Sequence, residues 1–150
     1  MLTNKEINQK MQVSEDDKPI LDYALAELFF EFSRANGTRG GTYGMARQTA
    51  LEQIDSYIMT LDPNNPVSRY LAAKNAELRK KWAGAIMRSP KSDKVPQYAK
   101  DKKSQKIVDA RVTKTLGRVN DQVKKYALER DKMIQLIYVL TQAQSQMNDM

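Results

Sequence analysis

Two side-chain types that perform much of enzyme chemistry are missing from this chain. Its 150 residues include no histidine and no cysteine. Nucleophilic catalysis by a Ser-His or Cys-His pair and zinc binding through thiolates are therefore impossible. The commonest general base near neutral pH is absent as well. Carboxylates, lysines, arginines, tyrosines and hydroxyls remain without a visible catalytic pairing, so we expect no catalytic residue, no enzymatic activity and no small-molecule substrate.

Glu27 and Glu31 are spaced as metal-binding carboxylates on a helix would be, because residues four apart lie one turn apart. Such a pair resembles half of the di-metal site of helical bundles, but that site also requires a Glu-x-x-His pair. The chain has no histidine to complete it. We therefore predict no metal and no cofactor, and we interpret the two glutamates as a solvated pair at the edge of an apolar helix face.

Positive charge is concentrated in one part of the chain. Residues 69–125 carry 17 Lys and Arg against 5 Asp and Glu, a net charge of +12, whereas the remainder carries −5 and the whole chain +7. Side chains of this type neutralise phosphates without reading base sequence. We predict non-specific binding to duplex nucleic acid through Arg79, Lys80, Lys81, Lys100, Lys102, Lys103, Lys106, Arg111 and Lys114.

Two other interpretations of this charge stay open. The same side chains would serve a helical adaptor or regulator that binds an acidic protein partner. They would also suit an ordinary helix whose charges face water. Salt-dependent binding to random DNA distinguishes the nucleic-acid hypothesis from both.

A glycine-rich bend is predicted at residues 37–44, which hold four of the six glycines. Glycines let backbone N–H groups approach an anion, so Arg39 and Arg47 could make a phosphate contact there. The segment lacks the Gly-Lys-Ser/Thr ending of a P-loop and the preceding strand of a dinucleotide-binding motif. A flexible turn between two helices is the simpler interpretation.

The spacing of apolar residues predicts an all-α fold, a bundle of four shorter helices with a long heptad-patterned C-terminal helix. A capping box at Thr3 starts a short helix over residues 4–12. Helices follow from Ser14 to about 37, from Thr42 to 62 and from Pro66 to 89. Tyr70, Trp82 and Tyr98 could stack on bases, but a core position between Leu78 and Ile86 is the favoured interpretation for Trp82. Residues 1–92 and 93–150 form two regions of one structural unit.

The final helix is predicted over residues 97–147, which contain no proline and a single glycine, Gly117, where a break is possible. Its apolar positions alternate at spacings of four and three, the pattern of a coiled coil. Residues 133–140 are apolar almost all round, so either the first helices or neighbouring subunits must cover them. We predict a homo-oligomer or larger assembly through Val112, Leu116, Val119, Val123, Tyr126, Met133, Ile137 and Leu140.

The remaining features suggest where such a protein acts. No apolar run approaches the ~20 residues of a membrane-spanning helix. The first ten residues lack the basic and apolar parts of a signal peptide. We expect a cytoplasmic or virion protein that is not secreted. The favoured function is that of a structural or assembly protein of virion, phage or nucleoid type, which self-associates and binds nucleic acid.

Overall fold

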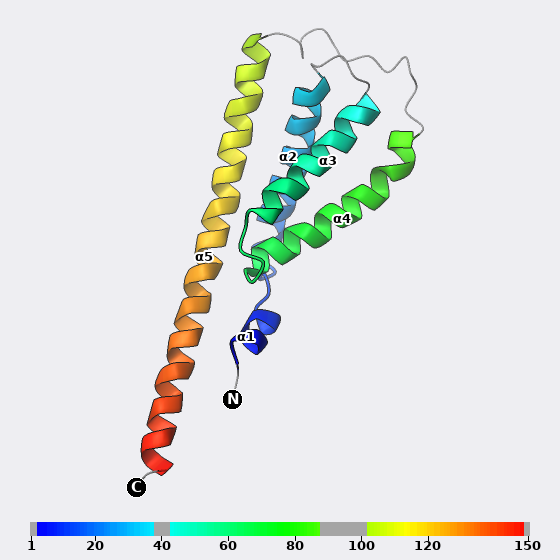
Figure 1. The fold of residues 1–150 in the computed structure, drawn as a ribbon. Helices are drawn as coiled ribbons and strands as arrows, with labels where there is room; N and C mark the ends of the chain where they lie inside the picture. Colours follow the sequence, from blue (N-terminus) through cyan, green and yellow to red (C-terminus); the bar gives the residue numbers. More distant parts are fainter. Residues whose placement is uncertain (1–2, 38–42, 88–101, 149–150) are drawn as a thin grey trace.

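Five helices make up the described part of the chain, which contains no strand, so the predicted all-α class is confirmed. The computed structural model describes residues 3–37, 43–87 and 102–148. In Figure 1, three helices form a group, the longest lies along one side of it, and the shortest lies beside the lower half of the longest. The helices are α1 (Asn4–Lys10), α2 (Lys18–Gly37), α3 (Tyr43–Met59), α4 (Pro66–Met87) and α5 (Lys102–Asn148).

The N-terminal helix α1 is docked on α5. Thr3 caps it, because its side-chain oxygen accepts the Glu6 backbone N–H at 3.2 Å, as the capping box predicts. The helix ends at Lys10, two residues earlier than expected, because Met11 adopts an extended conformation. Ile7 is only 1% exposed, so this short helix contributes a side chain to the core.

The main core lies among α2, α3, α4 and the first half of α5. Its apolar residues recur every three or four positions along each helix, which places them on one face. The predicted stop of α2 near residue 37 is observed. Of the bend predicted at residues 37–44, residues 38–42 lie outside the described residues, and Tyr43 and Gly44 already belong to α3. The largest apolar side chains that are almost completely buried are Ile7, Leu21, Leu28, Leu51, Ile54, Val67, Leu71 and Val119.

The turn between α3 and α4 is fastened to α5. Asn65 caps α4 as its sequence position predicts, since its Oδ1 accepts the Val67 backbone N–H at 2.9 Å. Pro66 occupies the first helical position, where a missing N–H costs little. The amide Nδ2 of Asn65 donates to the backbone carbonyl of Val123 at 2.9 Å. One side chain therefore begins α4 and holds it against α5.

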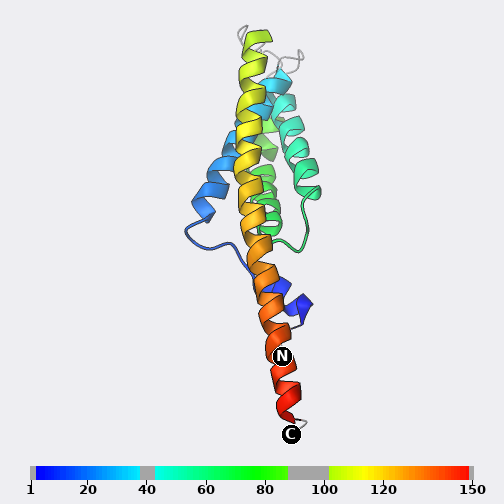
Figure 2. The ribbon, with the colours of Figure 1, turned by 90° about the vertical axis from the view of Figure 1, so that its left-hand side faces the viewer.

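Helix α5 runs without interruption through Gly117 for 47 residues, about 70 Å at 1.5 Å per residue. Its first half packs against the group of α2, α3 and α4, and its second half continues past them beside α1 (Figures 1 and 2). Val119 and Tyr126 are buried within the chain, and neighbouring seam positions pack against the same core. The first half of the heptad seam is therefore intramolecular. Among the described helices, none has the length and apolar content needed to cross a bilayer.

Candidate nucleic-acid interface

Three basic side chains of α5 form ion pairs with three acids at or near α2, which runs in the opposite direction. Arg111 Nη1 lies 3.3 Å from Glu31 Oε1, and Arg118 Nη1 lies 3.7 Å from Glu27 Oε2. Lys125 Nζ lies 2.8 Å from Asp17 Oδ2. The three basic residues are seven apart, so they share one side of α5 beside the seam. This arrangement, which we call the ion-pair ladder, fastens α5 to α2 with charge.

The interpretation of Glu27 and Glu31 as a solvated pair is wrong. The Glu31 side chain is 3% exposed and that of Glu27 is 25% exposed. The Thr115 hydroxyl also lies 2.8 Å from Glu27 Oε2, so this carboxylate has two partners on α5. The described residues contain no cluster of three acidic, histidine or cysteine side chains placed to hold a metal. These two carboxylates therefore hold α5 in place, and the packing of α5 over α2 is what buries them.

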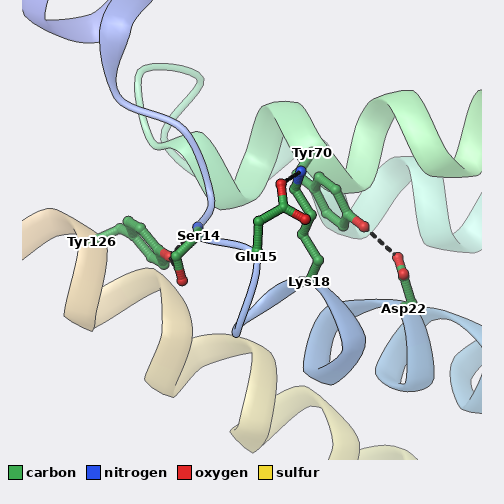
Figure 3. Close-up of polar contacts among 6 residues, drawn as sticks. All are labelled: Ser14, Glu15, Lys18, Asp22, Tyr70 and Tyr126. Atoms are coloured by element: carbon green, nitrogen blue, oxygen red, sulfur yellow. Dashed lines mark hydrogen bonds and ion pairs between the residues drawn. The ribbon is translucent and has the colours of Figure 1, made fainter.

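Asp17 is the centre of a buried polar cluster that was not predicted. Its Oδ2 accepts the Tyr126 hydroxyl at 2.6 Å and the Lys125 ammonium at 2.8 Å. The same Tyr126 oxygen accepts the Ser14 backbone N–H at 2.8 Å, a contact that Figure 3 shows. Hydrogen bonds from Lys125 first, and from Tyr126 second, hold the pKa of Asp17 below its ordinary value. The segment before α2 is thereby attached to the middle of α5.

The lowered pKa of Asp17 predicts how stability depends on pH. A carboxyl whose pKa is lower in the folded chain stabilises it fully above the unfolded value, about 3.9, and loses this effect as pH falls through the folded value. We expect Asp17→Asn to lower the free energy of unfolding by about 1–2 kcal/mol at pH 7. The difference from the wild type should shrink below about pH 4. Urea unfolding at pH 7, 5 and 3 measures it.

Asp16→Asn is the matched control, because it removes the same charge from the neighbouring exposed position. Its stability should follow that of the wild type within a few tenths of a kcal/mol at every pH. An Asp17→Asn difference that stays constant from pH 7 to pH 3 would contradict the assignment of the effect to the charged carboxylate.

Tyr70 makes a second connection between helices, and it is engaged with α2 rather than presented to a base. Its hydroxyl donates to Asp22 Oδ1 at 2.6 Å (Figure 3). Burial and this hydrogen bond raise the pKa of Tyr70 to about 12, so the phenol stays protonated at any physiological pH. Nearby, Lys18 Nζ lies 2.5 Å from Glu15 Oε1 at the start of α2.

The basic residues predicted on α4 differ in what they contact. Arg79 is paired with Asp55 of α3, whose carboxylate also accepts the Asn75 side-chain amide at 2.6 Å. Lys80 and Lys81 are exposed. The two lysines therefore remain accessible to a polyanion, whereas Arg79 primarily links α4 to α3.

The predicted basic residues of α5 divide in the same way. Arg111 belongs to the ion-pair ladder, although its side chain is 50% exposed. Lys106 and Lys114 are exposed and form no ion pair with any described residue. Lys102 and Lys103 lie in the first turn of α5. The last member of this group, Lys100, lies outside the described residues.

Of the two arginines assigned to the glycine-rich bend, the structure describes only Arg47. Arg39 lies outside the described residues. Arg47 lies in the first turns of α3, where its guanidinium carbon is 5.5 Å from the centre of the Trp82 ring. Trp82 itself is half-buried and is not part of the buried core, so the expected core position is not observed, and the side chain of Ile86 lies outside the described residues. Its ring contacts Phe29 of α2 instead.

Beyond residue 130, α5 carries the predicted association residues that the chain itself leaves uncovered. Ile137 packs against the core, whereas Met133 is 37% exposed and Leu140 58% exposed. Leu136 and Met147 are exposed as well, and spacings of three, four and seven place these four on one stripe, which we call the tip stripe. Comparison with protein-family models, curated proteins and solved structures finds no match to this chain.

Proposed function

We propose that this protein is a non-enzymatic structural or assembly component that binds nucleic acid through phosphate contacts and self-associates through the tip stripe. The observation that supports nucleic-acid binding best is the positive charge that remains after the interhelical ion pairs are formed. Lys80, Lys81, Lys106 and Lys114 extend into solvent on two helices. Residues 69–125 as a whole carry a net charge of +12.

The type of residue left exposed favours phosphates over a folded protein surface. The arginines at positions 79, 111 and 118 face carboxylates of neighbouring helices. What remains is mainly lysine, a flexible point charge that contacts phosphate oxygens without fixed geometry. Such contacts provide affinity and carry no sequence information. Affinity for unrelated duplexes should therefore be similar.

Self-association is proposed from the composition of the last part of α5. Residues 133–148 contain no charged side chain, although this part of the helix extends past the bundle. A second copy approaching there meets no like charge, in spite of the net charge of +7 on each chain. Solvent exposure of several large apolar side chains in one stripe is typical of an association surface.

The nucleic-acid proposal predicts a steep dependence of binding on salt. Each phosphate neutralised contributes about 0.9 to the slope of log affinity against log salt. Changing Lys102, Lys103 and Lys106 together to glutamine should lower that slope by about two to three units, with helicity unchanged. Fluorescence anisotropy of a labelled random duplex, titrated at four or five salt concentrations, measures the slope.

The matched control changes Lys5, Lys10 and Lys132 to glutamine, because these exposed lysines lie away from the proposed interface and alter net charge equally. This variant should keep the wild-type slope to within about one unit. A slope that falls equally in both variants would show a general charge effect. Absence of duplex binding at low salt would refute the proposal and favour an acidic protein partner.

A further inference from the structure

An open apolar pocket lies where α2, α3 and α4 meet, on the side of α2 that carries Phe30. Its volume is about 420 Å³, within the range of roughly 300–1,000 Å³ that small-ligand sites occupy. The walls are aromatic and the polar groups are mostly two arginines. The residues that line it are Ala26, Phe29, Phe30, Ser33, Arg34, Arg47 and Trp82.

Of the three rings in this pocket, Phe29 packs against the core, whereas Phe30 and Trp82 lie outside it. Phe29 and Trp82 lie with centres 5.7 Å apart and planes inclined by 33°. Phe30 is 58% exposed, and Trp82 is only half-buried. Folding usually removes such large apolar rings from water, so an open aromatic pocket favours a flat apolar ligand that completes the stacking.

Three charged side chains line this pocket or lie over its rings, and all three are positive. The guanidinium carbon of Arg34 is 5.5 Å from the centre of the Phe30 ring, and that of Arg47 is 5.5 Å from the Trp82 ring. Lys81 Nζ is 5.9 Å from the same Trp82 ring. A ligand that fits is therefore flat, largely apolar and attached to negative charge.

We propose that this pocket receives an unpaired base of single-stranded nucleic acid, with the flanking phosphates beside Arg34, Arg47 and Lys81. This inference rests on the proposed nucleic-acid binding and adds to it a preference for unpaired strands. Every base has a face that can stack on an aromatic ring, so the pocket accepts bases without selecting a sequence. A paired base inside a duplex cannot enter it, because both of its faces are already stacked.

The chain provides its own reporter for this site, since Trp82 is the only tryptophan. Titration with a single-stranded oligodeoxythymidine at low salt should quench Trp82 emission and shield the ring from acrylamide. A duplex of equal length should bind through the lysines, as measured by anisotropy, and should change the emission far less, because its phosphates reach Lys81 beside the ring while its bases stay outside the pocket. The two readouts separate occupancy of the pocket from phosphate binding elsewhere.

Phe30→Ala removes one ring of the pocket and leaves the fluorescent one in place. We expect it to weaken binding of the oligodeoxythymidine by roughly five- to tenfold and to leave duplex affinity unchanged. Tyr23→Ala is the matched control, because Tyr23 is an exposed aromatic residue of the same helix, away from the pocket, with 63% of its surface accessible. It should alter neither affinity, and circular dichroism should show both variants folded.

Each outcome of these experiments supports or overturns the pocket assignment. Quenching by the single strand that far exceeds quenching by the duplex, together with weaker single-strand binding and unchanged duplex binding in Phe30→Ala, supports it. Saturated binding of the single strand without a change in Trp82 emission or acrylamide access overturns it and leaves the nucleic-acid proposal intact. Equal quenching by the duplex also overturns it. Failure of both nucleic acids to bind at low salt refutes the proposed function and this inference with it.

Discussion

Replacing Val119 with aspartate is expected to unfold this protein or to release α5 from the bundle. Val119 is 0% exposed, in the part of α5 that packs against the other helices. A buried carboxylate without a partner costs about 3–5 kcal/mol, and domains of this size are stable by only about 5–15 kcal/mol. At about 2–4 °C per kcal/mol, thermal unfolding followed by circular dichroism should show a fall in midpoint of roughly 6–20 °C.

The same substitution at Ala127 controls for the presence of aspartate in a helix. Ala127 lies on the same helix with its side chain exposed. Ala127→Asp should lower the free energy of unfolding by less than about 1 kcal/mol. A Val119→Asp variant with the stability of Ala127→Asp would mean that α5 does not contribute to the core in solution.

If the protein self-associates through the tip stripe as proposed, replacing both Leu136 and Leu140 with aspartate is expected to give monomers that remain folded. Both side chains are more than half exposed in the single chain, so charging them leaves the core intact. Burial of a leucine contributes about 1.5–3 kcal/mol, and four exposed leucines would meet in the proposed contact between two copies. Self-association should weaken by at least roughly a hundredfold, which light scattering across a dilution series measures.

The control places aspartate at Tyr23 and Met59, two exposed apolar positions on the bundle. This variant receives the same added charge and should remain assembled. Ile137→Asp is a useful contrast, because Ile137 packs against the core. It should lower stability as well as association. A wild type that is monomeric at every concentration tested would remove the case for the tip stripe.

Periodicity predicts most of this fold because one face of every helix must be buried. The caps at Thr3 and Asn65 and the course of α5 follow from local sequence rules. Local rules do not predict which surface covers the seam, since a heptad pattern can pack against helices of the same chain or against a helix of another chain. In the structure α2 and α4 lie against its first half, and α1 lies beside the second half of α5.

The ion pairs that basic residues form within the chain were not predicted, for a physical reason. A count of charges treats all basic residues alike, whereas folding brings acids that are 80 or more residues distant beside some of them. Glu31 reaches Arg111 and Asp17 reaches Lys125 across helices. A signal was available in the spacing of seven that joins residues 111, 118 and 125, since positions beside a heptad seam commonly form interhelical ion pairs. No comparable signal joins Phe30, Arg47 and Trp82, which come from three helices.

The length of α5 places the proposed nucleic-acid-binding region and the tip stripe far apart. About 22 residues lie between Lys114 and Leu136, which is roughly 33 Å along the axis. If two copies join at their tips, each basic region faces away from the contact, and the pair becomes a bivalent spacer. Such a pair is too extended to hold both regions on one short duplex, and it is suited to bridging two separate strands or distant segments of one. Attachment of the first region would then raise the effective concentration of the second, so assembly and nucleic-acid binding would reinforce each other through geometry alone.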